Sequence, residues 1–237
     1  MKGQPNATAN TEDFEFAALR EAKNYRAALL HDFSPYLRGD VLEVGAGIGQ
    51  MSEILLNHPA VESLTSIEPN AAFCAQIRTR LPRLDLIEGT VADLPEGHSC
   101  NAILSVNVLE HVEHDAEELR AYHALLKPAN GALCLFVPAR QEIYAPIDRD
   151  FGHFRRYSRR GLESKLRSAG FESIQIRYYN LVGYFLWWLS FCILKQRTFT
   201  PSSVRLFDRV AFPVIHRVES KLLHPPIGQN LLVIAHA

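Results

Sequence analysis

The segment VLEVGAGIGQ, residues 41–50, leads from an apolar strand directly into three glycines at alternate positions. Glycine permits a tight turn and close approach of a ligand to bare backbone, while amide groups at the start of the next helix can face polar ligand atoms. A dinucleotide fingerprint would place its last glycine where this chain has Gln50. Glu43, just before the glycines, favours a cationic group over a pyrophosphate. The segment therefore predicts a nucleotide-like ligand that carries positive charge.

Strand and helix signals alternate along the rest of the chain. Near-continuous apolar strands separated by amphipathic segments are typical of a parallel sheet with helices on both faces. The sequence predicts a doubly wound α/β fold. The expected strands are 40–45, 63–68, 84–89, 101–106, 132–138, 172–179 and 231–237, and the expected helices are 14–30, 50–57, 70–80, 115–127 and 159–169.

Composition narrows the class of protein. With 47% hydrophobic and 22% charged residues among 237, the chain is not fibrous or disordered. A formal charge of −1 provides no general field for a polyanion, so nucleic acid would need a local basic patch. Four cysteines form no CxxC pair, and the polar start of the chain lacks an apolar stretch of signal-peptide length. We expect a reduced, cytoplasmic protein.

Two connections are long for this fold class, 139–158 and 180–230. Connections of about 2 to 6 residues are usual, and long ones often carry lids or binding elements. Ligands of open α/β sheets bind beyond the carboxyl ends of the strands, where the 139–158 loop begins. We predict one domain over 1–237, with a helical cap over 181–228 that lies over the site.

The pattern E-x-G-x-G-x-G at 43–49 resembles the first motif of class I S-adenosylmethionine-dependent methyltransferases. A GHFRRYS loop and an aromatic insert before the last strand resemble their small-molecule branch. The resemblance implies a seven-stranded sheet in the order 3-2-1-4-5-7-6 with an antiparallel last strand. The supporting motifs are SIEPN (66–70), VADLPEG (91–97), SVNVLEHVEH (105–114) and LLKPANGAL (125–133).

The same resemblance implies a binding site for S-adenosylmethionine, or its product S-adenosylhomocysteine. Glu68 would hold both ribose hydroxyls, and Asp93 would meet the adenine amino group with Leu94 beside the ring. The implied donor residues are Glu43, Gly45, Ala46, Gly47, Gly49, Glu68, Pro69, Asp93, Leu94 and Asn107.

His111 and His153 are the candidate catalytic residues. Histidine titrates near neutrality, so His111 could take the proton that an oxygen or nitrogen acceptor must lose. Transfer from a sulfonium can also proceed through positioning and desolvation without a base. Alternatively, His111 packs at the start of a helix while Asn107 and Glu110 shape the cofactor pocket.

A metal cofactor is not expected. In quinone-pathway and small-RNA O-methyltransferases, a similar E-x-x-E-H segment binds a divalent cation. Here Asn107 replaces the first acid ahead of Glu110 and His111, and losing a carboxylate weakens so small a site. His114 and Asp115 are expected to be surface residues that cap the next helix.

One basic cluster spans 148–167, where seven Lys and Arg residues accompany three acids. A loop with glycine, aromatic residues and paired arginines suits an anionic acceptor. Alternatively, Arg–Asp pairs brace the loop, and Ser158 is a helix N-cap. The predicted acceptor contacts are Tyr25, Glu110, Tyr144, His153, Arg155, Arg156, Tyr157 and Trp187.

The apolar run 181–194, LVGYFLWWLSFCIL, is shorter than the roughly 20 residues of a membrane-spanning helix. Three interpretations stay open for it. It could be buried against the sheet or a second copy of the chain, it could be a lid over an apolar acceptor, or it could give peripheral membrane contact through 181–197.

We therefore predict methyl transfer from S-adenosylmethionine to oxygen or nitrogen of a small-molecule or lipid-like acceptor. An RNA methyltransferase that uses the 148–167 cluster is an alternative, although the neutral net charge disfavours nucleic acid. A catalytically silent methyltransferase-like binding module is another.

Overall fold

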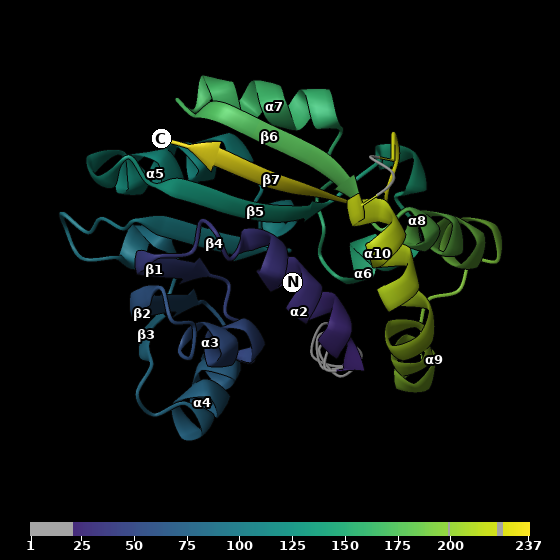
Figure 1. Cartoon of the computed structure of the whole chain (residues 1–237), viewed down its shortest axis with the longest axis horizontal. Coiled ribbons are helices and arrows are strands. Elements are labelled where there is room, and N and C mark those ends of the chain that lie inside the picture. Colours follow the sequence, from purple (N-terminus) through teal and green to yellow (C-terminus); the bar gives the residue numbers. More distant parts are fainter. Residues whose placement is uncertain (1–20, 199, 222–224) are drawn as a thin grey trace, which may run out of the picture.

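The computed structural model describes residues 21–198, 200–221 and 225–237. Its centre is a seven-stranded sheet in the order β3-β2-β1-β4-β5-β7-β6 (Figure 1). β7 runs antiparallel to both of its neighbours, and the other pairings are parallel. The predicted doubly wound fold and strand order are confirmed.

The strands are β1 (Gly39–Val44), β2 (Val61–Glu68), β3 (Asp85–Glu88), β4 (Ala102–Val106), β5 (Ala132–Pro138), β6 (Glu172–Tyr179) and β7 (Asn230–His236). The helices are α2 (Lys23–Phe33), α3 (Gln50–Leu55), α4 (Ala71–Arg80), α5 (Asp115–Leu126), α6 (Pro146–Asp150), α7 (Arg159–Ser168), α8 (Leu181–Trp187), α9 (Pro201–Leu206) and α10 (Phe212–Lys221). Short 3₁₀ turns cover Val91–Asp93, Leu109–His111, Lys127–Ala129 and Gln141–Ile143, and π-helical turns cover Trp188–Ile193 and Phe207–Ala211.

The helix expected over 14–30 differs at its end. Residues 14–20 lie outside the described part of the chain, and α2 continues to Phe33. Leu30 and Phe33 are buried against the sheet, so packing extends the helix beyond the predicted end. Ser34 at the C-cap still has helical backbone, and its amide donates to the Leu30 carbonyl at 2.7 Å.

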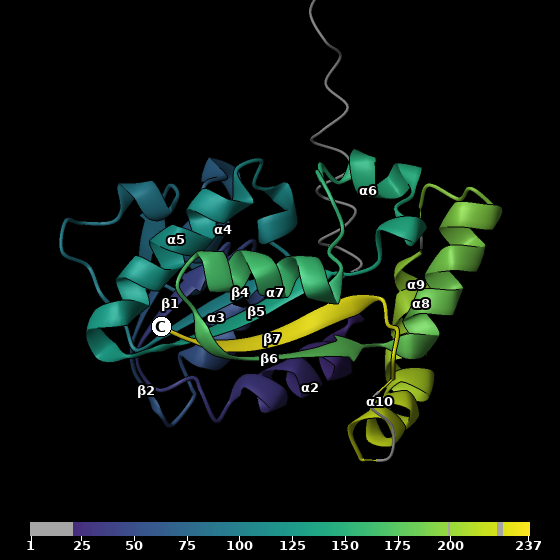
Figure 2. The same cartoon turned by 90° about the horizontal axis from the view of Figure 1, so that it is seen from above.

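Helices cover both faces of the sheet (Figure 2). On one face, α5 and α7 pack Tyr122 and Leu162 against β5 and β7. On the other, α2 and α10 pack Phe33 and Phe212 into a second cluster. β5 is buried at every position, which explains its unbroken apolar sequence. The predicted N-cap of α7 is confirmed, since Ser158 accepts a hydrogen bond from the Gly161 amide.

The insert between β6 and β7 stands at the carboxyl edge of the parallel strands, with α8, α9 and α10 grouped there (Figure 1). Two buried carboxylates anchor it. Asp208 accepts hydrogen bonds from the first-turn amides of Asn24 and Tyr25 in α2, at 2.9 and 2.8 Å. Glu219 accepts from the amides of Asn180 and Leu181, where α8 begins. The insert thereby caps two helices, one of them 184 residues away along the chain.

Replacing Asp208 with alanine is expected to lower the free energy of unfolding by about 2 kcal/mol, because two first-turn amides of α2 lose their charged acceptor. Chemical denaturation measures the difference. Asp85, an exposed carboxylate on β3, is the matched control, and Asp85→Ala should change stability by less than about 0.5 kcal/mol. Equal effects of the two substitutions would argue against the cap.

Asp115 is buried, which corrects its expected surface position, whereas His114 is exposed at the N-cap of α5. The Asp115 carboxylate accepts from Lys165 Nζ at 2.6 Å and from the Tyr157 hydroxyl at 3.0 Å, and it pairs with Arg155 at 2.8 Å. Burial alone would raise the pKa of Asp115, but these donors outweigh it and hold the pKa below its ordinary value. The side chain ties α5 to α7 and to the loop before it.

Asp115→Asn is expected to lower the free energy of unfolding by about 2 kcal/mol at pH 7. Because folding lowers the pKa of Asp115, the stability that its carboxylate contributes depends on pH. This contribution is complete above the unfolded pKa of about 3.8 and disappears as pH falls through the lower folded value. Denaturation curves of the two proteins should therefore converge in acid. A difference that stays constant down to pH 2 would contradict this assignment.

None of the helices within the described ranges is long and apolar enough to cross a membrane.

Candidate functional site

A cavity of about 370 Å³ opens at the carboxyl ends of β1, β2 and β4, where open α/β sheets bind ligands. It contains most of the residues predicted to hold the donor. Its lining includes Glu43, Gly45, Ala46, Gly47, Glu68, Pro69, Asn107 and His111, together with Tyr25, Met51, Asn70, Phe73, Phe136 and Phe151.

The glycine turn adopts left-handed backbone at all three glycines, with φ of 76°, 56° and 77° at Gly45, Gly47 and Gly49. A Cβ at Gly45 would lie 2.4 Å from Cγ2 of Val108, so no side chain fits there. Gly49 lies between two lining residues, Ile48 and Gln50, and its predicted donor contact stays a prediction. It precedes α3 and packs closely against Ile77 of α4, outside the cavity lining.

Glu68 ends β2 and is 5% exposed. One carboxylate oxygen accepts from the Gly47 amide at 2.7 Å, and the other accepts from the Asn70 amide at 2.9 Å. The side chain lines the cavity and also holds the glycine turn against the start of α4. These contacts fit a carboxylate that receives ligand hydroxyls on a rigid support.

Glu43 lies on β1 and is buried in the same cavity wall. Its Oε2 accepts from the hydroxyls of Ser52 and Ser66, at 2.5 and 2.6 Å. Burial raises the pKa of Glu43, although both hydroxyl donors favour the ionised form. A cationic group in the cavity would further favour that form, so the residue fits the predicted contact with an ammonium.

Asp93 and Leu94 lie at the end of the 3₁₀ turn that follows β3. Asp93 is exposed, and its Oδ2 accepts from the amide and the hydroxyl of Thr90, at 2.8 and 3.0 Å. These bonds, the amide first, lower the pKa of Asp93. Leu94 packs against the core. Within the described part of the chain neither residue is among those that line the cavity, and their predicted contacts with adenine stay predictions.

A second cavity, of about 840 Å³, adjoins the first and shares Tyr25, Asn107, Phe136 and Phe151 with it. Its outer wall comes from the insert, including Leu186, Trp187, Phe191 and Phe207. The wall nearest the sheet includes Glu110, Pro138, His153, Arg156 and Asn230. Tyr25 stands between the cavities, where its hydroxyl donates to the Asn230 side chain at 3.3 Å. Both long connections therefore contribute residues to the second cavity's lining.

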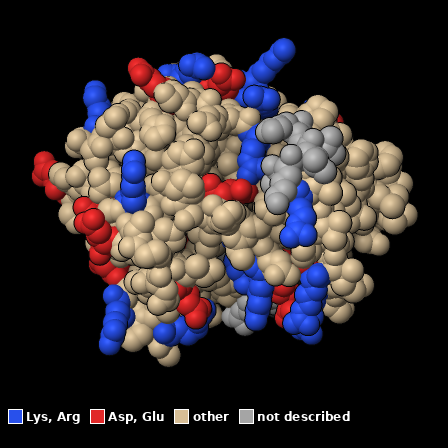
Figure 3. Space-filling model, viewed as in Figure 1, with Lys and Arg blue, Asp and Glu red and all other residues tan. Residues whose placement is uncertain are grey.

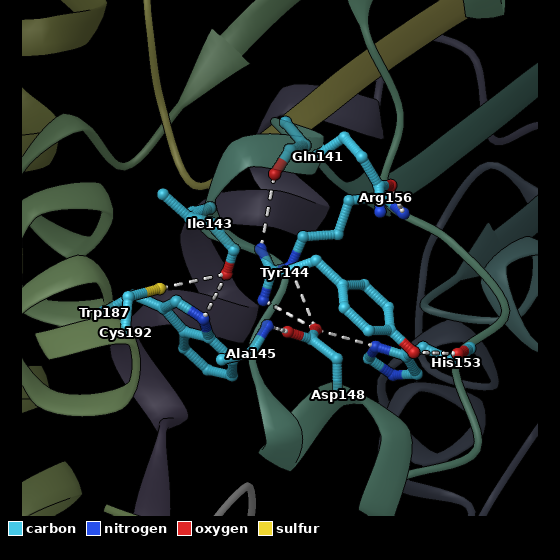
Figure 4. A network of polar contacts seen from close by, with 10 residues as sticks. Gln141, Ile143, Tyr144, Ala145, Asp148, His153, Arg156, Trp187 and Cys192 are labelled. Atoms are coloured by element: carbon cyan, nitrogen blue, oxygen red, sulfur yellow. Dashed lines mark hydrogen bonds and ion pairs between the residues drawn. The ribbon is translucent and has the colours of Figure 1, made fainter. Parts of the chain in front are cut away.

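The 139–158 loop is organised around Asp148, which is fully buried (Figure 4). Its carboxylate accepts from the Ala145 amide at 2.8 Å and pairs with Arg156 at 2.7 Å and His153 at 3.1 Å. The Arg156 guanidinium lies over the Trp187 ring at 4.5 Å. The loop and the insert thus form one wall of the second cavity.

His111 lies on the turn after β4, with its ring 4.7 Å from that of His153. Desolvation, and then the neighbouring His153, lower the pKa of His111 to about 4. The residue is nevertheless exposed, and it lines the first cavity. His111 is therefore uncharged at neutral pH and can accept a hydrogen bond or a proton.

A family model described as a methyltransferase domain matches residues 17–176. The chain belongs to this methyltransferase domain family. A probable S-adenosylmethionine-dependent methyltransferase of Mycolicibacterium smegmatis is 27% identical over 140 residues, which cover 56% of this chain and 52% of that protein. The chain spans about half the length of the curated relatives it matches.

Solved structures agree with the fold. A methyltransferase of Haloferax volcanii, solved with a methyltransferase activator, has a TM-score of 0.65 at 15% identity, covering 100% of this chain and 99% of that one. A SAM-dependent methyltransferase of Archaeoglobus fulgidus has a TM-score of 0.56 at 15% identity, covering 91% and 94%. At these identities the likeness concerns the fold alone.

In this methyltransferase domain, three predicted acceptor contacts lie outside both cavity linings. The Tyr144 hydroxyl donates to the His153 carbonyl at 2.7 Å. Arg155 pairs with Asp115, and the buried Tyr157 hydroxyl donates to the Leu109 carbonyl at 3.0 Å. All three contacts brace the loop, and the pair of Arg155 with Asp115 is of the Arg–Asp kind that the alternative interpretation of the basic cluster expected. Tyr25, Glu110, His153, Arg156 and Trp187 do line the second cavity.

Several lining residues were not predicted. Asn70 caps α4 by accepting from the Ala72 amide at 2.9 Å, and it lines the donor cavity. Its signal was available, because asparagine directly after the Glu68-Pro69 strand end is a typical N-cap. Phe151 and Asn230 carry no such signal, since only folding brings the loop and β7 to the cavity.

Proposed function

We propose that the protein transfers a methyl group from S-adenosylmethionine to oxygen or nitrogen of a small-molecule or lipid-like acceptor. The observation that carries this proposal is the pair of adjoining cavities, one walled by the glycine turn with Glu43 and Glu68, the other by the insert. The family membership and the names of the relatives support the same donor.

The residues present fit the donor. The buried Glu43 suits a cationic group, and Glu68 suits paired hydroxyls at the end of β2. When bound, S-adenosylmethionine supplies an electrophilic methyl group on a sulfonium. The chain's own residues orient both reactants and exclude water, chiefly through Tyr25, Phe136 and Phe151 where the cavities meet.

The second cavity supports an apolar acceptor with a polar group at one end. Trp187 and Phe191 provide an apolar wall, and Arg156 places a buried cation beside it. The outer face of the insert is also apolar, because Phe185 and Trp188 are 52% and 44% exposed there. We infer that a lipid-like acceptor enters the second cavity past the helices of the insert.

The RNA alternative is less well supported. Four of the seven basic residues in 148–167 are held in ion pairs, namely Arg155, Arg156, Lys165 and Arg167. On the face shown in Figure 3, positive and negative side chains are interspersed. Such a surface provides little of the concentrated positive charge that nucleic acid requires.

A thermal-shift assay with S-adenosylhomocysteine, S-adenosylmethionine and NAD(H) tests the donor. A ligand at 100 times its dissociation constant adds about 2.7 kcal/mol of stability. Stabilisation by S-adenosylhomocysteine and not by NAD(H) is expected, and the reverse would overturn the proposal. Incorporation of radiolabelled methyl into organic extracts, compared with RNA, then tests the acceptor class. Donor binding without incorporation into either would favour the silent binding module.

A further inference from the structure

Three side chains from two segments meet where the cavities join. Glu110 and His111 lie on the turn after β4, and His153 lies in the loop after α6. Each residue offers one atom that could bind a metal ion, and these three atoms all lie within 4.8 Å of one another. The Phe154 amide donates to the Glu110 carbonyl at 2.8 Å, so a backbone bond fixes the two segments together.

The His153 ring is held in one orientation. Its side chain is only 8% exposed, and its Nδ1 lies 3.1 Å from Oδ1 of Asp148, an oxygen that Arg156 also approaches (Figure 4). An ionised carboxylate can only accept, so Nδ1 carries the hydrogen. Nε2 is buried and has no hydrogen-bond partner among the described residues. A buried bare imidazole nitrogen is costly unless a ligand completes it.

We propose that Glu110, His111 and His153 bind a divalent first-row transition-metal ion, such as Zn²⁺ or Co²⁺. Two imidazoles and one carboxylate suit such ions, whereas Mg²⁺ and Ca²⁺ prefer oxygen ligands throughout. Asp148 has the usual outer role in such sites, in which a carboxylate orients the ligating histidine through its other nitrogen. The ion also places positive charge beside the buried Glu110 carboxylate.

The position of the site gives the ion a role. His111 lines the donor cavity, whereas Glu110 and His153 line the second cavity. Three protein ligands leave coordination positions open. A polar oxygen of the acceptor can fill one of them and be held toward the donor. This role rests on the proposed function, but binding of the ion does not.

The expectation of no metal rested on Asn107 replacing an acid within the 107–111 segment. His153 lies 42 residues after His111 in the chain, so the 107–111 segment by itself gives no sign of it. Folding supplies the missing ligand from the loop, and a nitrogen ligand in place of a carboxylate shifts the preference from Mg²⁺ to transition metals.

Metal binding can be measured without donor or acceptor. The full chain, freed of metal by chelation, is titrated with Co²⁺ and followed by its visible absorption, and Zn²⁺ is then added as competitor. We expect one Co²⁺ per chain, displaced by Zn²⁺ but not by a hundredfold excess of Mg²⁺. His153→Ala and Glu110→Gln should each weaken Co²⁺ binding at least tenfold, and Asp148→Asn should weaken it about 10- to 100-fold. His98→Ala, in the loop before β4, is the matched control and should bind as the unaltered chain does.

Two results would overturn the proposal. One is absence of saturable Co²⁺ binding by the unaltered chain, a result that does not depend on whether any variant folds. The other is unchanged affinity in His153→Ala with its cooperative unfolding intact. Neither depends on methyl transfer, so failure of the metal site and failure of the proposed function remain distinguishable.

Discussion

Replacing Gly45 with alanine is expected to lower the free energy of unfolding by about 3 kcal/mol and to weaken S-adenosylhomocysteine binding at least tenfold. Left-handed backbone costs a non-glycine residue about 1–2 kcal/mol, and overpacking adds about 1–3 kcal/mol. Gly45 meets both penalties, because its φ is 76° and a Cβ would lie 2.4 Å from Val108. Relief of the clash must move the turn that walls the donor cavity. Chemical denaturation and calorimetric titration measure the two effects.

Gly97 provides a matched control, since its φ is 79° but nothing lies within 4 Å of a Cβ there. Gly97→Ala should therefore show the backbone penalty alone, about 1–2 kcal/mol, with donor affinity unchanged. If the two variants lose equal stability, contact with Val108 does not constrain the turn. If Gly45→Ala binds the donor normally, the turn does not shape the donor site.

The fold could be predicted because its signals are local. The central strands β4, β5 and β7 are nearly continuous apolar runs of the right length, and the glycine turn carries its own conformational requirement in sequence. Glu43 and Glu68 were placed correctly in the cavity wall because both lie at the ends of neighbouring parallel strands, whose carboxyl ends must share one edge.

The errors concern side chains whose partners lie elsewhere in the chain. Asp115 is acidic and opens a helix, which is typical of a surface cap, yet Lys165 and Arg155 arrive from distant segments to bury it. The meeting of His111 with His153 likewise depends on how the 139–158 loop folds back.

Glu68→Ala is expected to weaken S-adenosylhomocysteine binding by about 1.5–3 kcal/mol, roughly 10- to 150-fold. The carboxylate is positioned to receive ligand hydroxyls, and it also accepts from the Gly47 and Asn70 amides. Its removal therefore takes away a ligand contact and loosens the turn that carries Gly47. Glu68→Gln keeps the shape but loses the charge, so it should lie between the unaltered chain and Glu68→Ala. Calorimetric titration orders the three proteins.

Glu88 is the control that separates these contributions from a general loss of charge at this edge of the sheet. Glu88 lies opposite Glu68 in the pairing of β2 with β3. Its side chain is 42% exposed, forms an ion pair with Arg78 and lies outside the cavity lining. Glu88→Ala should leave donor affinity within twofold, because exposed pairs contribute little. If Glu68→Ala and Glu88→Ala weaken donor binding equally, the general negative charge at this edge of the sheet is responsible. If Glu68→Ala binds the donor normally, Glu68 is not part of the donor site.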